Sequence, residues 1–159
     1  MAGKVLVTVF SASGVTRRVG KEIARIAGAD FYEIAPKDPY TSDDLNWMNS
    51  HSRSSIEMND PASRPEISGT VSDMASYDKI IIGFPIWWGV APRIIETFLE
   101  SYDFDGKTII PFCTSGGSGV GRSDRKLHKN TKGNAKWEKG VQINRPDEAA
   151  IRKWLGKVL

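Results

Sequence analysis

Short apolar runs alternate along this chain with segments in which apolar residues recur every three or four positions. The runs predict strands. Because they are apolar almost throughout, they are typical of strands covered on both faces of a parallel sheet. Four such strands are expected at residues 4–10, 30–35, 79–84 and 107–113, and a fifth within residues 135–143.

The intervening segments predict amphipathic helices that pack an apolar stripe against this sheet. The three stripes lie at residues 15–26, 95–102 and 151–158. Gly28 follows the first stripe and is placed to end that helix, and Pro92 precedes the second, where proline fits a first helical turn. Strands that alternate with helices imply right-handed crossovers, and therefore an α/β domain with a parallel sheet and helices on both faces.

The connection between the second and third strands is the least regular part of the pattern. Residues 41–49 and 71–76 are expected to form short helices. Residues 50–68 are rich in Ser, Asn, Asp and Pro, which is typical of a surface loop. No repeat, low-complexity tract or interdomain linker interrupts the sequence, so residues 1–159 are expected to form a single domain.

The composition is that of a globular protein, with 40% apolar and 26% charged residues. No apolar run approaches the roughly 20 residues that span a bilayer. Met1 leads almost directly into the first strand with no signal-like segment, and Cys113 is the one cysteine, which suits a reducing compartment. These features favour a cytoplasmic protein without an internal disulfide.

The net charge of +3 is concentrated in residues 122–139, which hold seven basic and two acidic residues. This segment is either a solvated helix and loop or a patch that attracts an acidic partner or a phosphorylated ligand. Nucleic-acid binding is disfavoured, because Trp137 is the segment's one platform for base stacking. His51 and His128 lack metal-ligand spacing, so no metal site is expected, and no side chain is identified as a catalytic base.

In open parallel sheets, ligands bind at the carboxyl ends of the strands, and the segment that follows the first strand suits an anion. Ser11, Ser13 and Thr16 offer hydroxyl groups, and Gly14 lets backbone N–H groups turn toward a phosphate at the start of the next helix. A serine-rich helix cap would have the same composition. The segment is not a triphosphate-binding P-loop, because Glu22 stands where that motif requires Ser or Thr.

Two further strand ends have unusual composition. Trp87 and Trp88 are adjacent in a turn bounded by proline and glycine, where two exposed indoles would need a flat ligand or a partner to cover them. The alternative places one indole in the core and one on the surface. Residues 114–121 hold four glycines within six positions, which let a backbone approach a ligand closely, although their spacing does not match a dinucleotide-binding fingerprint.

With these three loops, the sequence resembles the flavodoxin family over nearly its full length. Residues 11–16 are similar to the family's S/T-x-S/T-G-x-T phosphate loop, and residues 84–89 and 114–121 to its two flavin-flanking loops. The segments GFPIWWGVAPRIIETFLESYDF and TSGGSGVGRS resemble those of a bacterial subgroup of flavodoxin-like proteins. The resemblance implies a flavodoxin-like three-layer α/β sandwich, a five-stranded parallel sheet of order 2-1-3-4-5, and FMN at its carboxyl edge.

The resemblance also implies which residues contact FMN. The residues expected to hold its phosphate are Ser11, Ser13, Gly14, Val15 and Thr16. The residues expected on one side of the flavin are Pro85, Ile86, Trp87, Trp88 and Gly89. The residues expected on the other side are Thr114, Ser115, Gly116, Gly117 and Gly121. The sequence departs from the family in two ways, which leave the FMN site in place but make the redox partner uncertain to assign. Flavodoxins are usually acidic, whereas this chain is basic. Many flavodoxins stack a second aromatic residue of the later loop on the flavin, whereas residues 114–121 contain no aromatic residue.

Electron transfer between redox partner proteins is the function that the resemblance favours. The alternative is an NAD(P)H-dependent FMN oxidoreductase that reduces quinone-like or nitro acceptors. In that case residues 50–68 would form a substrate cover in which Arg53 is the residue of interest, although an ordinary surface arginine is the favoured interpretation of Arg53. A third possibility, a binding module that has lost flavin, is disfavoured by the intact phosphate loop and the two tryptophans.

Overall fold

The structure, a computed structural model, describes residues 4–12, 14–87, 90–114, 127 and 133–159. Its centre is a sheet of order β2-β1-β5-β6-β7 in which β8 also pairs with β6 and all neighbours are parallel. The strands are β1 (Lys4–Val9), β2 (Asp30–Glu33), β5 (Tyr77–Pro85), β6 (Thr108–Thr114), β7 (Lys136–Trp137) and β8 (Val141–Gln142). This sheet confirms the α/β class and the expected order 2-1-3-4-5.

Two short segments rather than one strand occupy the fifth position of the sheet. Trp137 of β7 pairs with Ile109 of β6, and Val141 of β8 pairs with Phe112. Four steps along the edge chain therefore match three steps along β6, so one extra residue interrupts the ladder, as in a β-bulge. The sequence between the two segments is polar and contains a glycine, which is why the hydrophobic pattern placed this strand without fixing its ends.

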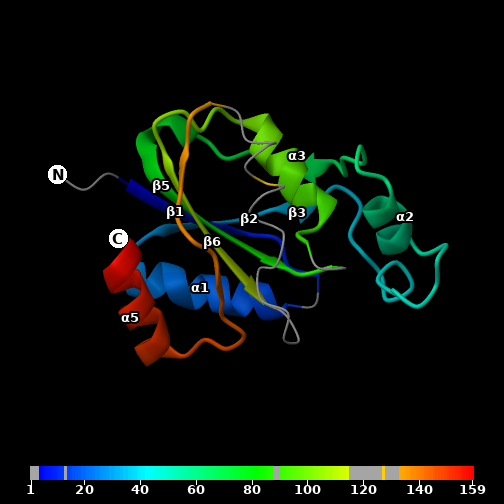
Figure 1. The fold of residues 1–159 in the computed structure, drawn as a ribbon, viewed down its shortest axis with the longest axis horizontal. Helices are drawn as coiled ribbons and strands as arrows, with labels where there is room; N and C mark the ends of the chain where they lie inside the picture. Colours follow the sequence, from blue (N-terminus) through cyan, green and yellow to red (C-terminus); the bar gives the residue numbers. More distant parts are fainter. Residues whose placement is uncertain (1–3, 13, 88–89, 115–126, 128–132) are drawn as a thin grey trace.

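Helices cover both faces of the sheet (Figure 1). α1 (Val15–Ala27) and α5 (Glu148–Val158) lie on one face, and α3 (Arg93–Ser101) lies on the other. The three helices confirm the apolar stripes of the sequence. α1 ends at Gly28, and α3 begins directly after Pro92, as expected.

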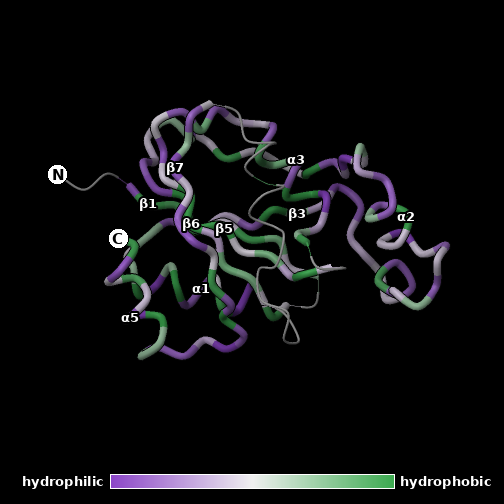
Figure 2. Tube along the Cα trace, viewed as in Figure 1, coloured by the Kyte–Doolittle hydropathy of each residue, from purple (hydrophilic) through white to green (hydrophobic). Residues whose placement is uncertain are grey.

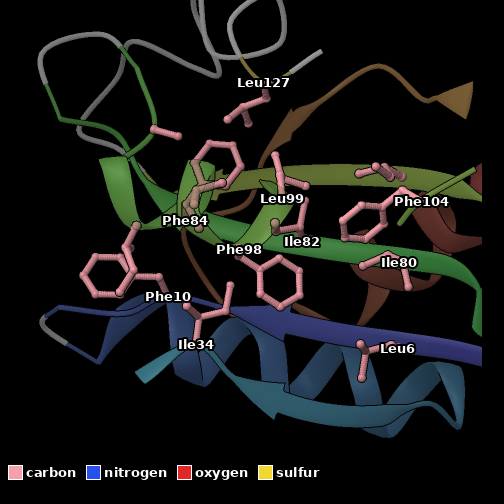
Figure 3. Packing of buried hydrophobic residues seen from close by; sticks show 14 of the residues in the cluster. Leu6, Phe10, Ile34, Ile80, Ile82, Phe84, Phe98, Leu99, Phe104 and Leu127 are labelled. Atoms are coloured by element: carbon pink, nitrogen blue, oxygen red, sulfur yellow. The ribbon is translucent and has the colours of Figure 1, made fainter. Parts of the chain in front are cut away.

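Each face of the sheet has its own apolar core. Between the sheet and α3, Ile80 and Ile82 of β5 pack in one cluster with Phe98 and Leu99 of α3 (Figure 3). Ile81 faces the opposite way and belongs to the cluster beneath α1 and α5, as the alternation of side chains along a strand requires. Figure 2 shows the apolar colour gathered in the central strands, which accounts for the near-continuous apolar runs of the sequence.

The segment between β2 and β5 differs from the expectation. Residues 41–49 form turns, and the helix of this region is α2 (Arg53–Asn59), inside the segment expected to be a loop. The expected helix at 41–49 is therefore wrong. Asn46 and Asn49 explain the difference, because their side-chain oxygens accept hydrogen bonds from backbone N–H groups two residues later and hold the chain in turns.

A small antiparallel ladder closes the base of this segment. β3 (Ala35–Pro36) pairs with β4 (Ile67–Ser68), so that residues 37–66, here called the excursion, leave and re-enter the domain at one place. The short helix expected at residues 71–76 is a single 3₁₀ turn, η1 (Met74–Ser76). In Figure 1 the excursion lies beyond the end toward which β5 points, whereas the start of β1 and the C-terminus lie at the opposite end of the sheet.

Gly83 gives a direct test of the packing at the carboxyl end of β5. A Cβ atom at this position would lie 2.1 Å from Cζ of Phe112, its neighbour across the ladder. We expect Gly83→Ala to reduce the free energy of unfolding by about 3 kcal/mol, because a buried ring has to move. Urea unfolding monitored by circular dichroism measures this loss.

Gly156 provides the matched control. A Cβ atom there meets nothing within 4 Å, and the residue lies in α5. Gly156→Ala should leave stability unchanged or raise it by up to about 1 kcal/mol through helix propensity. Equal effects of the two substitutions would contradict the described packing of β5 against β6.

Candidate functional site

The turn that joins β1 to α1 has the shape expected of an anion-binding loop. The backbone N–H of Gly14 donates a hydrogen bond to Oγ of Ser11 at 3.0 Å, and Gly14 has φ +95°, a conformation that favours glycine. Because the Ser11 hydroxyl accepts this bond, its own proton is not consumed by it and can be donated to a ligand. Val15 begins α1 with its side chain more than one third exposed.

A buried pair of hydroxyl groups joins this turn to the end of β6. Oγ1 of Thr16 and Oγ1 of Thr114 are 2.8 Å apart, and the two residues are only 2% and 7% exposed. One hydroxyl donates to the other, so the pair keeps one proton for a third group. The contact brings the first and fourth expected strand ends together, as the sequence predicted for the sheet edge.

The loop after β5 also contacts the end of β6. Pro85 lies opposite Thr114 in the ladder, and the N–H of Ile86 donates to the carbonyl oxygen of Thr114 at 3.2 Å. Trp87 and Val90 then exchange two backbone hydrogen bonds of 2.8 and 3.2 Å, which close a tight turn. All three loops that the sequence singled out therefore contact one another at the carboxyl edge of the sheet.

Part of the predicted site lies outside the described residues. The predicted contacts concerned are Ser13, Trp88, Gly89, Ser115, Gly116, Gly117 and Gly121. The basic segment 122–139 is described only at Leu127 and from Gly133 onward. These residues stay predictions from the sequence.

Arg17 is a charged neighbour of the turn that sequence reasoning did not select. Its Nε and one terminal nitrogen donate to the two carboxylate oxygens of Glu33 at 2.7 and 2.6 Å. The other terminal nitrogen lies 3.6 Å from where a Cβ of Gly14 would be. The hydrogen bonds to Glu33 raise the pKa of the Arg17 guanidinium, which keeps a fixed positive charge beside the turn.

Trp87 packs as part of an aromatic cluster rather than as a free surface ring. Its ring centroid lies 5.7 Å from that of Phe10 and 5.5 Å from that of Tyr40, both in edge-to-face geometry. Phe10 and Tyr40 are themselves 5.6 Å apart. Trp87 is thus held between the end of β1 and the excursion, whereas Trp88, on which the choice between the two interpretations of the indoles also depends, lies outside the described residues.

A polar network fixes the excursion behind this cluster. The guanidinium carbon of Arg53 lies 3.9 Å from the centroid of the Tyr40 ring, its Nε donates to Glu57 at 3.0 Å, and a terminal nitrogen donates to the carbonyl of Asp38. Tyr40 donates to the other carboxylate oxygen of Glu57. Burial, followed by this hydrogen bond, raises the pKa of Tyr40, so its hydroxyl remains a donor at physiological pH. These contacts hold Arg53 within the excursion, and its role in a substrate cover stays a prediction.

Arg93 ties the same region to α3. Its guanidinium donates to the carbonyl oxygens of Glu57 and Met58 at 3.3 and 2.9 Å, near the end of α2, and to Oε1 of Glu96 at 2.9 Å. Arg93 and Glu96 are only 3% and 4% exposed. A helix end satisfied by a buried charged side chain is held firmly, so α2 and the excursion are fixed to the domain.

The excursion and the sheet edge enclose a cavity of about 480 Å³. Three segments of the chain contribute to its walls: the turn after β1, the loop after β5, and the excursion. The lining residues are Ala12, Leu45, Trp47, Ser54, Pro85, Ile86 and Trp87. The contribution of Leu45 and Trp47 was not expected from the sequence, which placed a possible substrate cover at residues 50–68, where Ser54 lies.

An α/β domain with an anion-type turn and an aromatic wall at one sheet edge is the architecture of a nucleotide-cofactor-binding protein. The family model described as flavodoxin matches residues 4–158, and the chain belongs to the flavodoxin family, whose cofactor is FMN. A search of curated proteins gives no match.

Solved structures agree with this membership. Two proteins provisionally named flavoproteins, from Bacteroides eggerthii DSM 20697 and Bacteroides uniformis ATCC 8492, are 49% and 46% identical to this chain, each with a TM-score of 0.92. Each covers 98% of this chain, with 98% and 99% of its own length aligned. A flavoprotein from Lactobacillus acidophilus NCFM, solved in complex with FMN, is 23% identical with a TM-score of 0.71, covers 97% of this chain and 99% of its own, and shares the fold.

Residues 4–12, 14–87, 90–114, 127 and 133–159 contain neither a metal site nor a membrane-spanning helix. No group of three or more His, Cys, Asp or Glu side chains in this part of the chain is placed to hold a metal ion. None of its helices is long and apolar enough to cross a membrane. Cys113 is fully buried in the core near the end of β6.

The anchoring of α2 can be tested through Arg93. Arg93→Met should lower the free energy of unfolding by about 3 kcal/mol, because the end of α2 loses two hydrogen bonds from a charged donor and the buried Glu96 loses one of its ion pairs, while it keeps the pair with Arg64 at 3.3 Å. Urea unfolding gives the total loss, and hydrogen exchange should show faster exchange of the α2 amides.

Arg152→Met is the matched control, since Arg152 pairs with Glu148 on the exposed face of α5 at 3.3 Å. Exposed pairs contribute at most about 1 kcal/mol, so this variant should stay close to the wild type in both measurements. Unchanged exchange of α2 in Arg93→Met would contradict the anchoring.

Proposed function

We propose that this chain binds FMN at the carboxyl edge of its sheet and transfers electrons through it between redox partners. The contact between Thr16 and Thr114 carries this proposal, since it gathers the hydroxyl groups of two separate loops at one point. FMN, when bound, supplies the redox chemistry, and the protein contributes binding, orientation and electrostatics.

The start of α1 fits a phosphate group. α1 has no side-chain cap at its N-terminus and no acidic residue in its first turn. The first N–H groups of a helix lack partners within the helix and carry a partial positive charge, so they attract an anion. The guanidinium of Arg17 lies beside Gly14, where it is held by its ion pair with Glu33.

α5 gives the contrast within the same molecule. Its N-terminus is capped by Asp147, whose carboxylate accepts from the N–H of Ala150, and Glu148 adds a negative charge in the first turn. The protein therefore neutralises one helix N-terminus with its own carboxylates and leaves the other without them. This difference supports an external anion, the FMN phosphate, as the partner of α1.

Each described residue of the proposed site has a role in binding FMN. Ser11 and the Thr16–Thr114 pair donate hydroxyl protons to the phosphate, and the N–H groups of Val15 and Thr16 point toward it. Pro85, Ile86 and Trp87 form the wall beside the flavin ring. The remaining contacts rest on the sequence pattern alone, and they are Ser13, Trp88, Gly89, Ser115, Gly116, Gly117 and Gly121.

The phosphate assignment is tested with Thr16→Val. Apo-protein is titrated with FMN and, separately, with riboflavin, which lacks the phosphate. Loss of a hydrogen bond to a charged group costs about 1.5–3 kcal/mol, so the dissociation constant for FMN should rise about tenfold to a hundredfold while that for riboflavin stays unchanged. Quenching of flavin fluorescence measures both constants.

Thr8→Val is the control for a buried threonine. Oγ1 of Thr8 is buried in β1 with no hydrogen-bond partner in the described part of the chain, so replacing it should not weaken FMN binding. Equal losses for FMN and riboflavin in Thr16→Val would remove the phosphate from this turn. A wild-type chain that leaves added FMN unbound would overturn the proposal itself.

A second function, an NAD(P)H-dependent FMN oxidoreductase with quinone-like or nitro acceptors, is favoured by one observation: the cavity beside the cofactor loops. Anaerobic mixing of the FMN-loaded protein with NADPH separates the two. A carrier is expected to keep its oxidised flavin absorbance for minutes and to be reduced only when a reductase is added. Bleaching by NADPH alone would favour the oxidoreductase.

A further inference from the structure

We propose that Tyr40 is a positioning residue for the cofactor: its ring fixes the indole of Trp87, and that indole is part of the wall that meets the flavin ring of FMN. The inference rests on the proposed function, because it concerns how FMN is held. It deepens that function by giving a residue of the excursion control over the affinity for the flavin ring without contact between the two.

The backbone of Trp87 is fixed, but its side chain needs neighbours to hold it. The two hydrogen bonds with Val90 that close the turn join main-chain atoms alone. The indole is only partly buried, and a side chain in this situation keeps several rotamers unless other side chains exclude them. Ordering a side chain when a ligand binds costs free energy. A neighbour that orders the indole beforehand therefore raises the affinity for the ring that packs on it.

Two rings restrict the indole of Trp87, and they come from different parts of the molecule. Phe10 is fully buried in the core, so its contact with the indole does not depend on the excursion. Tyr40 contacts both Trp87 and Phe10 in edge-to-face geometry, with ring centroids 5.5 and 5.6 Å apart. Tyr40 is thus the excursion's contribution to the position of the indole.

The ring of Tyr40 is itself held at two points. Arg53 stacks on its face, with the guanidinium carbon 3.9 Å from the ring centroid. The hydroxyl group of Tyr40 donates to one carboxylate oxygen of Glu57, and Nε of Arg53 donates to the other at 3.0 Å. A ring held at both its face and its hydroxyl group has little freedom, so it presents a fixed edge to Trp87.

The lining of the cavity indicates the path by which Tyr40 acts. Trp87 lines the cavity, whereas Tyr40 and Arg53 do not. A ring that packs on the indole from the cavity is therefore affected by Tyr40 through Trp87. It follows that the effect of Tyr40 on flavin affinity disappears when the indole is absent.

The first measurement compares two flavins. Tyr40→Leu frees the indole of Trp87, and its renewed ordering on binding should raise the dissociation constant for FMN about fivefold. Riboflavin has the same ring without the phosphate, so its dissociation constant should rise by the same factor. This result differs from that expected for Thr16→Val, which changes the affinity for FMN alone. Quenching of flavin fluorescence measures all of these constants.

A double-mutant cycle tests the path through the indole. Trp87→Ala removes part of the wall and weakens the binding of both flavins. Added to Trp87→Ala, Tyr40→Leu should cause no further loss, because no indole remains to be positioned. An equal loss in both backgrounds overturns the proposal, since Tyr40 then acts by direct contact or through the fold as a whole. Unchanged flavin affinity in Tyr40→Leu alone also overturns it.

A conservative variant and a matched control isolate the role of the ring. Tyr40→Phe keeps an aromatic ring between Arg53 and Trp87 and should recover most of the wild-type affinity. Tyr102→Leu removes another partly buried tyrosine, which packs 5.1 Å from Phe98 and does not line the cavity. This control should lose stability and bind both flavins like the wild type. A loss of affinity as large as that of Tyr40→Leu would assign the effect to destabilisation and overturn the proposal.

A second variant keeps the test decisive if thermal unfolding shows that Tyr40→Leu does not fold. Arg53→Met leaves the ring of Tyr40 in place and removes the guanidinium from its face. Both dissociation constants should then rise about twofold, and this rise should be absent with Trp87→Ala. A missing rise, or an equal rise in both backgrounds, overturns the proposal.

The outcomes separate this inference from the proposed function. Failure of the wild type to bind FMN, measured first, overturns both. If the wild type binds FMN and the two substitutions of the cycle act independently, the proposed function stands and the positioning role of Tyr40 is lost.

Discussion

The hydrogen bond between the hydroxyl groups of Thr16 and Thr114 is the contact on which the site depends. The two residues lie 98 positions apart, and only the parallel pairing of β1 with β5 and β5 with β6 brings the ends of their strands to one edge. In a parallel sheet every strand ends at the same side, so the loops after β1, β5 and β6 have to meet there. The contact is buried and polar, which means that its remaining proton is held where water has little access. In the proposed function, this proton is the one donated to the phosphate of FMN.

The excursion adds a second layer to this edge through polar contacts rather than through a core of its own. Arg53 donates a hydrogen bond to the carboxylate of Glu57. Arg93 donates to backbone carbonyl oxygens near the end of α2. Charged hydrogen bonds are directional, so they fix the orientation of a short helix that has little apolar area to bury. The consequence is that Trp87 is clamped from both sides, by Phe10 of the domain and by Tyr40 of the excursion. Trp87, which lines the cavity, therefore belongs to one aromatic cluster with Phe10 and Tyr40.

The sheet, its order and the three main helices could be predicted from the sequence. A continuous apolar run such as Ile80–Ile82 in β5 predicts a strand that is buried on both faces. The excursion could not. Its helix has seven residues, its turns are held by Asn46 and Asn49, and its anchors are partners 35 and 36 residues apart in the chain, for which a sequence pattern carries no signal. The same limit applies to Arg17, whose importance appears only when Glu33 at the end of β2 is seen to hold it beside Gly14.

The difference in capping between the N-termini of α1 and α5 connects the stability of the domain with ligand binding. α5 carries Asp147 and Glu148 at its start and gains the stabilisation of a capped helix without any ligand. α1 forgoes this stabilisation, since Gly14 provides no side-chain cap and no acidic residue follows in the first turn. A typical cap contributes about 1 kcal/mol, so the apo-protein is less stable by roughly that amount than it would be with a capped α1. An anion bound at this end restores the missing interaction and adds its own binding free energy, and a ligand that binds only the folded state raises stability in proportion to the logarithm of its concentration. The feature that makes α1 a poor helix start in isolation is therefore the same one that couples folding of the domain to occupation of the site.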